Sequence, residues 1–530
     1  MRGTALRPTR QFAGVDHVPR VHEHKQRRFC VYYQPCDDST RSVFVHNNCV
    51  CNELVALRNR VIFECPKPQQ AALRRLHLLA RRVADWIPRE SKSADWWDSY
   101  RGRKRQRYRD AADSLNYRPL SKRDSYIKAF VKPEKVFEVK DPRLIQARSP
   151  RYNVAIGAYL KPIEHHLYRL RGTRQLRHVL PPGLVIAKGH NMSQRATLLK
   201  EKWNRFNNPI CFSLDASRFD AHVNELLLVE HHIYRRYWRD PELDRLLAWQ
   251  VNNRGRTAGG IRYHCRYGRM SGDMNTALGN CLLSVLMAAD YMRRKGIKWD
   301  MLCDGDDTLL IVEKRDAHLL DDITPAYLEY GMVVKLIVAN TWHDITFCHT
   351  FPCSTVIGER LVSHPERVLS RALVGVRHWD NPKFIRKYLS LIGYCELALN
   401  MGVPVLQEFA CMMLAWGEGF PTKWITSGHV LKALREERKF AIEPRRITPE
   451  ARLDFELATG MSVEQQRALE GAFRALSRHK DASQTQAITK AKTTDEPVQA
   501  AIKAARRLAH SAGPGPPTLQ GPLHRLARWG

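Results

Sequence analysis

Apolar and polar positions along the chain follow patterns that predict helices and strands in separate regions. Helical spacing is expected near residues 154–170 and over most of 355–450, most clearly at 384–399 and 407–420. Beyond about residue 475 the sequence turns to Lys, Gln, Thr and Ala and then to GPGPPTLQGP. That composition lacks the apolar content for a core, so a largely disordered tail is expected there.

The region from 210 to 350 combines apolar runs with acids at the ends of those runs. An apolar strand ends at Asp215, and apolar runs at 301–303 and 308–312 flank the acidic segment 304–307. The second pattern predicts a β-hairpin whose tight turn carries acids, with Gly305 supplying backbone freedom. Between them, a Ser-Gly loop at 271–272 opens into an apolar helix.

Two upstream segments are strongly basic. Residues 121–151 alternate apolar, strand-like runs with nine Lys and Arg, and prolines interrupt any long helix. An extended basic segment suits a channel that contacts phosphates. Residues 101–109 place six cations in nine positions, and a solvated basic loop is as good a reading as an RNA contact.

Composition narrows the class of partner. The 530 residues hold 86 Lys and Arg against 54 Asp and Glu, a formal charge of +32, so a polyanion, above all nucleic acid, is expected. No run approaches the roughly 18 to 20 apolar residues of a spanning helix. The basic first residues are not followed by an apolar segment of the secretory type, so no signal peptide and a cytosolic location are expected.

The spacing of the cysteines bears on disulfide formation and zinc binding. The thirteen cysteines form no compact framework, so reduced thiols are expected in place of disulfides. The N-terminal region could in principle ligate zinc, but its spacing matches no standard pattern and ordinary thiols are the favoured reading. The residues concerned are Cys30, Cys36, Cys49, Cys51, Cys65, His22, His24 and His46.

The order of the acidic and polar elements suggests nucleotidyl transfer. Mg²⁺ prefers one or two carboxylates plus substrate phosphates, so Asp215 with Asp306 would make a minimal site, and Asp220 would be free to meet a ribose. Each element alone is weak evidence, because Asp-Gly turns and capped helices are common. Their occurrence in order, within about 100 residues, leaves little room for coincidence.

These segments closely resemble motifs of the positive-strand RNA virus polymerases of the tombusvirus-like group. DASRFDAHV, RMSGDMNTALGN and GDD resemble their motifs A, B and C. The resemblance implies a right-hand fold in the α/β (α+β) class, with an antiparallel palm sheet flanked by helices, and RNA-dependent RNA synthesis with two Mg²⁺ ions, Mn²⁺ being a possible substitute. It implies that Asp215, Asp306 and Asp307 form the metal site, and that a further set selects the ribose 2′-hydroxyl: Asp220, Ser271, Gly272, Thr276 and Asn280.

Further segments resemble the flanking motifs of the same family. KAFVKPEKV and DPRLIQARSPRYNV are similar to motif F, YGMVVK to motif D and FCHT at 347–350 to motif E. The resemblance makes Lys335 a candidate proton donor to pyrophosphate. It also gives candidate contacts to the triphosphate or RNA, with Arg148 the strongest: Lys128, Lys132, Lys135, Arg143, Arg148 and Arg151.

The implied organisation and partners follow from the same resemblance. Five regions are expected: an N-terminal, fingers-associated region at 1–110, fingers at 111–210, palm at 211–350, a helical thumb at 351–450 and a basic tail at 451–530. Expected partners are RNA template and product and ribonucleoside triphosphates. A viral or host membrane-anchoring protein is a further candidate, with action in the host cytoplasm, peripherally on membranes.

Two other classes of protein share some of these features. A reverse transcriptase also uses strand acids, but Gly305 and the set Ser271, Thr276 and Asn280 favour a site suited to a ribose hydroxyl. A basic RNA-binding or capsid protein would account for the charge alone. It would leave the ordered aspartates unexplained.

Overall fold

The computed structural model describes residues 13–19, 30–31, 44–136, 140–375, 382–418 and 441–478. The chain forms two compact units. Unit 1 contains Met1–Phe29, Val43–Pro352 and Gly358–Ser363, and unit 2 contains Cys30–Ser42, Cys353–Ile357 and His364–Gly530.

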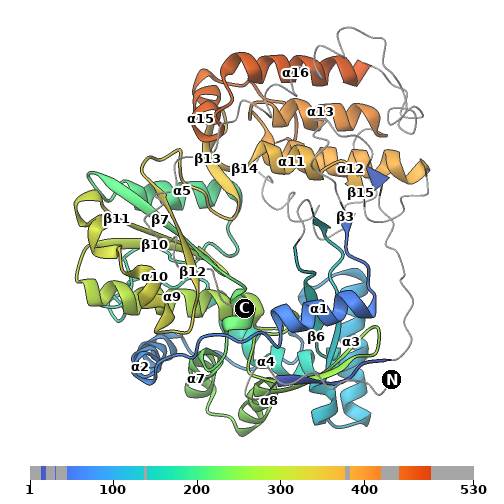
Figure 1. Ribbon diagram of the computed structural model, residues 1–530, viewed down its shortest axis with the longest axis vertical. Helices are drawn as coiled ribbons and strands as arrows, with labels where there is room; N and C mark the ends of the chain where they lie inside the picture. The colour runs from blue at the N-terminus through green and yellow to red at the C-terminus, as the bar shows by residue number, and fades with distance from the viewer. Residues whose placement is uncertain are drawn as a thin grey trace, which may run out of the picture. The chain divides into compact units, whose positions relative to one another are not determined.

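Unit 1 is built around a four-stranded antiparallel sheet, here called the central sheet. Its strand order is β10-β11-β7-β12, so the two inner strands are β11 and β7. Helices cover both faces, α9 and α10 on one side and α5 on the other (Figure 1). The elements are β7 (Pro209–Ala216), β10 (Trp299–Asp304), β11 (Asp307–Glu313), β12 (Val334–Ala339), α5 (Met192–Trp203), α9 (Thr276–Lys295) and α10 (Ile323–Leu328).

Burial on both faces explains the nearly continuous apolar strands. Along β7, Phe212 and Leu214 pack with α9, whereas Cys211 packs with α5 on the opposite face. Successive side chains of a strand point to opposite faces, so a strand covered on both sides needs apolar residues at consecutive positions. The expected strand before Asp215 and the expected hairpin at 301–312 are both confirmed.

A second, five-stranded sheet in unit 1 carries the basic segment. Its order is β1-β9-β8-β4-β6, and β4 pairs in parallel with β8 but antiparallel with β6. Alternate residues Ile127, Ala129 and Val131 of β4 are buried, which leaves the residues between them on the outer face. The strands are β1 (Ala13–His17), β4 (Ile127–Val131), β6 (Leu144–Ala147), β8 (Asn252–Thr257) and β9 (Arg262–Arg266), with β3 (Phe44–Val45) and β5 (Lys135–Val136) as a separate pair.

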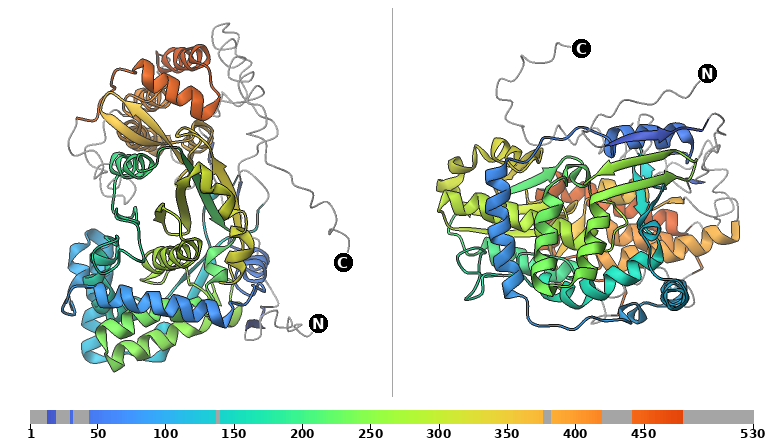
Figure 2. Two further views of the ribbon diagram at one scale, coloured as in Figure 1. Left: turned by 90° about the vertical axis from the view of Figure 1, so that its left-hand side faces the viewer. Right: turned by 90° about the horizontal axis from the view of Figure 1, so that it is seen from below.

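Helices complete the core of unit 1. Helix α2 packs along α7 and contacts α9 (Figure 2). Its buried Leu73, Leu76 and Val83 recur at helical spacing. The expected helix near 154–170 is confirmed as α4. The helices are α1 (Val50–Arg60), α2 (Gln70–Trp86), α3 (Gly102–Tyr117), α4 (Pro150–Leu167), α6 (Phe219–His222), α7 (Leu226–Trp238) and α8 (Pro241–Val251).

Unit 2 is mainly helical in its described part. Helix α13 packs against α12 and α16, and the two helices expected at 384–399 and 407–420 are confirmed as α12 and α13. The elements are α11 (Pro365–Arg371), α12 (Pro382–Asn400), α13 (Leu406–Trp416), α15 (Pro449–Thr459), α16 (Val463–Arg478) and the strand pair β2 (Cys30–Val31) and β15 (Val374–Gly375).

Three sequence expectations differ from the structure. A solvated basic loop, one of the two interpretations of residues 101–109, is wrong, because residues 102–109 begin helix α3, whose Tyr108 packs on Trp96. The helical stretch expected from 355 begins with strands, β13 (Thr350–Thr355) and β14 (Gly358–Ser363). Residues 451–478, assigned to a disordered tail, form parts of α15 and α16; residues 479–530 lie outside the described part. In each case packing partners distant in sequence decided the local structure.

Within the described ranges, no helix is both long enough and apolar enough to cross a membrane. Of the N-terminal residues considered for zinc, His22, His24 and Cys36 lie outside the described residues.

Candidate active site

Strand register gathers charged residues at one end of the central sheet. Lys335 on β12 lies directly opposite Asp215 on β7, and Asp304 on β10 lies opposite Asp307 on β11. The β7–β11 ladder begins at Thr308 and Leu214, which places Asp307 beside Asp215. Residues opposite one another on neighbouring strands share a face. Four residues from four strands therefore meet on one face of the sheet.

The turn between β10 and β11 is held by helix α9. Asp304 and Asp307 close a two-residue turn in which Gly305 has φ +76°, a left-handed conformation that favours glycine. Ser284 Oγ donates a hydrogen bond to the Gly305 carbonyl (2.9 Å), and the Gly305 amide donates to Cys281 Sγ (3.1 Å). The helix thus fixes the turn that presents Asp306.

Carboxylates repel one another at this end of the sheet. Burial, together with the neighbouring charge of Asp307, raises the pKa of Asp306 to about 6. Burial also raises the pKa of Asp307, with Asp304 and Asp215 adding to the effect, and burial raises the pKa of Asp220. Asp215 and Asp306 are exposed and Asp307 is half-buried, so a cation from solvent can reach them. Carboxylates that repel one another are stabilised by a bound cation. The donor set, hard oxygens from Asp215, Asp306 and Asp307, therefore fits a divalent ion such as Mg²⁺.

Asp304 differs from the other acids because it is already paired. Its carboxylate accepts hydrogen bonds from Arg195 on α5 (2.5 Å) and from Lys188 (3.2 Å). Burial would raise the pKa of Asp304, but these two cations outweigh it and the pKa is lowered. Asp304 is therefore an ionised side chain whose charge protein cations balance. The sequence did not indicate these partners, which lie more than 100 residues upstream.

A strained turn brings Cys348 against the same acids. Cys348 and His349 have φ values of +52° and +61°, a backbone conformation that is unfavourable for residues other than glycine. The Cys348 thiol donates a hydrogen bond to Asp307, and burial beside Asp307 and Asp304 raises the pKa of the thiol. The FCHT segment was noted in the sequence, but the contact of Cys348 with Asp307 was not predicted.

Two of the residues predicted to select ribose are in direct contact. Asn280 Nδ2 on α9 donates to Asp220 Oδ1 on α6 (3.0 Å). Arg269 Nε in turn donates to Asn280 Oδ1 (3.0 Å). Asp220 also acts electrostatically on Asp306, so this polar pair adjoins the acidic turn.

The other three predicted ribose residues hold the Ser-Gly loop in place. Ser271 Oγ accepts from the Gln146 amide (3.1 Å) and donates to the Leu144 carbonyl (3.2 Å), and the Gly272 amide donates to the Gln146 carbonyl (2.8 Å). A Cβ on Gly272 would lie 2.6 Å from that carbonyl oxygen. Thr276 Oγ1 donates within the same loop, to the Met270 carbonyl (2.9 Å). In this arrangement Ser271 and Gly272 bind the loop to β6, and Thr276 stabilises the loop from within.

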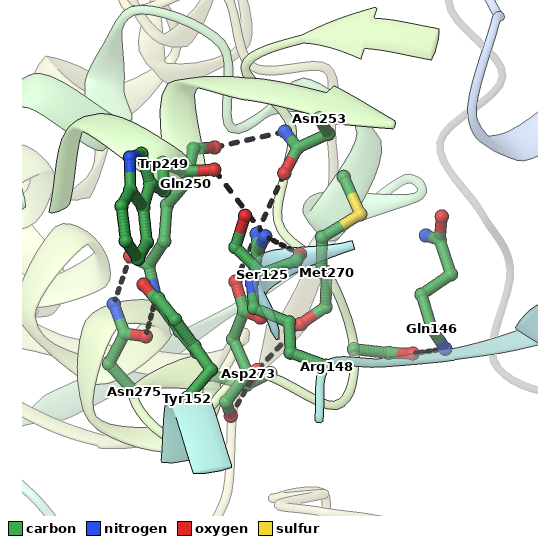
Figure 3. A network of polar contacts seen from close by, with 12 residues as sticks. Ser125, Gln146, Arg148, Tyr152, Trp249, Gln250, Asn253, Met270, Asp273 and Asn275 are labelled. Carbon is green, nitrogen blue, oxygen red and sulfur yellow. Dashed lines mark hydrogen bonds and ion pairs between the residues drawn. The ribbon is translucent and has the colours of Figure 1, made fainter. Parts of the chain in front are cut away.

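Arg148, the strongest predicted phosphate contact, is fully buried. Its guanidinium donates to both carboxylate oxygens of Asp273 (2.6 and 3.2 Å), to Asn253 (2.7 Å) and to the Ser125 carbonyl (2.7 Å) (Figure 3). Arg151 is also buried, and its Nε donates to Asp124 (3.0 Å). Both guanidiniums face protein groups, so the arrangement does not support a direct phosphate contact by either.

The other predicted cations are exposed or partly exposed. Burial raises the pKa of Asp220 and of Asp306, and the positive charge of Arg143, just before β6, partly opposes that rise, so Arg143 lies near the acidic site. Lys132 pairs with Glu134 (3.0 Å), Lys135 lies on β5 at the surface, and Lys128 lies on the exposed face of β4. Of the predicted basic residues, Arg143 is therefore the one whose charge acts on both Asp220 and Asp306.

An antiparallel sheet with an acidic hairpin and a Ser-Gly loop is consistent with a polymerase domain, and comparison with known proteins gives the family. The family model for viral RNA dependent RNA polymerase matches residues 16–481. The chain therefore belongs to the viral RNA-dependent RNA polymerase family.

Curated relatives agree with this assignment. The chain is 35% identical over 454 residues to the RNA-directed RNA polymerase of Groundnut rosette virus (strain MC1), covering 82% of the chain and 52% of the relative. It is 33% identical over 462 residues to that of Melon necrotic spot virus (81% and 57%) and 33% identical over 449 residues to that of Tobacco necrosis virus (strain A) (80% and 61%). The chain thus spans roughly half to three fifths of the length of these relatives.

Proposed function

We propose that this chain is an RNA-dependent RNA polymerase that replicates a viral positive-strand RNA genome by adding ribonucleotides to the growing RNA 3′ end. The observation that carries the proposal is the meeting of Asp215, Asp306 and Asp307 at one end of the central sheet. Membership of the family supports the same activity. The central sheet would be the palm, the five-stranded sheet part of the fingers, and the helices of unit 2 the thumb.

The three aspartates would hold two divalent cations, Mg²⁺ or Mn²⁺ in its place. When bound, such ions activate the attacking 3′-hydroxyl and neutralise the charge of the leaving pyrophosphate. Asp304 would stay outside the metal site, because Arg195 and Lys188 already balance its charge. The Cys348 thiol would orient Asp307 by its hydrogen bond.

The remaining polar residues would position the substrates. Asp220 and Asn280 would recognise the ribose 2′-hydroxyl, with the Ser271-Gly272 loop fixed on β6 beside them. Arg143, which is exposed near Asp220 and Asp306, would contact the triphosphate. Lys335, opposite Asp215 on the same face, would donate a proton to the leaving pyrophosphate.

The test is incorporation of labelled ribonucleotide on a single-stranded RNA template with Mg²⁺. We expect Asp306→Asn to lose at least about 10³-fold in rate, because a metal ligand loses its charge, while RNA binding is retained. Asp321→Asn, a change at an exposed acid away from the turn, is the matched control and should leave the rate unchanged. RNA binding by wild type and variants without any synthesis would reduce the function to RNA binding.

We also propose that the chain acts in the host cytoplasm and reaches membranes through another viral or host protein or through its basic surface. Co-flotation of the singly expressed chain with vesicles that contain anionic lipid at low salt, but not at high salt, would support the basic surface. Flotation only with a co-expressed viral protein would support a protein partner.

A further inference from the structure

A fully buried ion pair lies directly behind the predicted ribose-selecting pair. Arg269 precedes the Ser-Gly loop and Glu230 lies on α7, and neither side chain is exposed (0% each). Transfer of two charges from water to a protein interior is unfavourable, and well-packed apolar residues are often at least as stabilising. Stability alone is therefore a weak reason for this pair, and its contacts point to another role.

Arg269 determines which way the Asn280 amide faces. Arg269 Nε is a donor only, and it donates to Asn280 Oδ1 (3.0 Å). The amide must then present its Nδ2 hydrogens to Asp220, whose Oδ1 accepts at 3.0 Å. The backbone repeats the link, since the Arg269 amide donates to the Asp220 carbonyl (2.9 Å). The orientation of both polar side chains thus depends on Arg269.

Glu230 holds Arg269 from a fixed position. Glu230 Oε2 pairs with Arg269, and Oε1 accepts from Asn275 Nδ2 (2.6 Å) and Tyr234 Oη (2.9 Å). Asn275 is itself held by Gln250 (3.0 Å), which belongs to the polar network around Arg148 (Figure 3). Both oxygens of Glu230 are therefore fixed by other residues, and the carboxylate cannot rotate freely.

Helix α9 has a glycine, Gly279, where the Glu230–Arg269 ion pair packs against it. A Cβ on Gly279 of α9 would lie 2.4 Å from both Arg269 Nη2 and Glu230 Oε2. Glycine inside a helix is less favourable than alanine, so its presence here lowers the stability of the helix. The cost is consistent with a requirement to seat the pair against the turn of α9 that carries Asn280.

We propose that Glu230 and Arg269 are positioning residues that orient Asn280 and Asp220 and so set the discrimination between ribonucleotides and 2′-deoxyribonucleotides. The inference rests on the proposed polymerase function. Neither residue would touch the nucleotide. Their effect would pass through the amide of Asn280, whose orientation determines whether Asp220 keeps its hydrogen-bond donor.

The decisive variant is Glu230→Gln with Arg269→Met. It leaves no unpaired buried charge, keeps an oxygen for Asn275 and Tyr234, and removes the donor to Asn280. The ratio of kcat/KM for ATP to that for 2′-deoxy-ATP should fall about 10-fold or more. The matched control is Asp300→Asn with Lys202→Met, which removes another buried ion pair (1% exposure each), between β10 and α5 and away from the acidic turn. Arg205 also pairs with Asp300, but its side chain is 31% exposed and can be solvated in the control. It should leave the ratio unchanged.

A second variant guards against misfolding of the first. Arg269→Lys keeps a cation for Glu230 but lacks the planar guanidinium that reaches Asn280, so it should lower the same ratio. An unchanged ratio in both folded variants would overturn the inference, as would an equal fall in the control.

Equilibrium binding of ATP and 2′-deoxy-ATP, measured on the same proteins, separates this inference from the proposed function. If the wild type makes no RNA, the polymerase proposal fails. The positioning role then stands if the wild type binds ATP preferentially and the variants lose that preference. It falls if wild type and variants bind the two nucleotides with the same ratio.

Discussion

Acidic residues at the end of the central sheet differ in charge state because their neighbours differ. Asp306 and Asp307 face other carboxylates and have raised pKa values, whereas Asp304 faces Arg195 and Lys188 and has a lowered one. A bound cation would relieve the repulsion between carboxylates at Asp306 and Asp307. It would be attracted less strongly to Asp304, whose charge is already balanced. Neighbouring acids in the same turn can therefore have separate roles.

The raised pKa of Asp306 predicts a stability that depends on pH in the metal-free protein. Its pKa is about 6 when folded against an ordinary 3.8, so the folded chain takes up a proton as pH falls through 6 before the unfolded chain does. The stability contributed by protonation is therefore lost as pH rises through 6. Asp306 is exposed to water, which screens much of this effect. In EDTA, we therefore expect Asp306→Asn to be more stable than wild type by about 1 kcal/mol at pH 8, and by less at pH 5. Urea denaturation at both pH values measures this.

Added Mg²⁺ should reverse the order at pH 8, because only the wild type retains the full set of ligands. A constant difference between the two proteins across this pH range would contradict the assignment of the raised pKa to Asp306.

Loss of the cation that balances Asp304 should disturb the metal site without unfolding the sheet. In Arg195→Met the carboxylate of Asp304 keeps only Lys188, so the acidic end becomes more negative. We expect a lower half-saturating Mg²⁺ concentration and a kcat reduced about 10-fold or more, since the added attraction is not at the productive position. Steady-state kinetics across a Mg²⁺ titration checks this.

Lys200→Met is the control, because Lys200 lies on the same helix but pairs with Glu359. Equal kinetic effects of the two changes would assign the result to helix α5 in general.

At the same residue scale, the sequence could identify acids but not the cations that accompany them. Asp215 and Asp306 follow from strand ends and an Asp-Gly turn, which are local patterns. The buried roles of Arg148 and Arg151 could not be read locally, because Asp273 and the backbone of Trp249 come together with Arg148 only in the fold. Arg143, five residues before Arg148, has the same residue type and remains exposed near the acids.

At the scale of elements, the turn between β10 and β11 links backbone conformation to the site. Gly305 has a left-handed φ with open space around an added Cβ, and so does Gly296 at the end of α9. The two glycines are therefore a matched pair, similar in conformation and different in position.

We predict that Gly305→Ala and Gly296→Ala each lower the free energy of unfolding by about 1 kcal/mol, from left-handed strain. Only Gly305→Ala should lower the rate of synthesis, by about 10-fold or more. A small shift of the turn would move Asp306 away from Asp215 and Asp307, the other proposed metal ligands. Thermal or urea unfolding combined with a synthesis assay measures both effects. Equal activity of the two variants would show that the turn tolerates movement.

Sequence patterns predicted the elements whose periodicity is strong and local. The strand before Asp215, the hairpin and helices α9, α12 and α13 were predicted, because each combines an apolar face with clear ends. Helix α3 was not predicted because its sequence is mostly charged and polar, with Ala111 its buried residue, and therefore shows no apolar face. The packing of Tyr108 on Trp96 involves a residue outside the helix and cannot be read from the sequence of α3 alone. The strands β13 and β14 were missed because the surrounding residues read as helix.

At the scale of the whole molecule, net charge predicts how RNA binding should respond to salt. With +32 formal charges, contacts to phosphate release counterions, so affinity should fall steeply as salt rises. We expect the affinity for single-stranded RNA to fall at least about 10-fold between 50 and 200 mM NaCl, with little dependence on sequence. Fluorescence anisotropy with two unrelated RNAs checks both points, and a flat response would contradict a channel built from these cations.

The register of the central sheet limits which mutations this sequence can accept during evolution. Lys335, Asp215 and Asp307 share a face only because three neighbouring strands are aligned residue for residue. Deletion of one residue within β7 or β12 would turn every side chain beyond it to the opposite face. Among descendants, length changes should therefore collect in connecting loops, while these strands change by substitution alone.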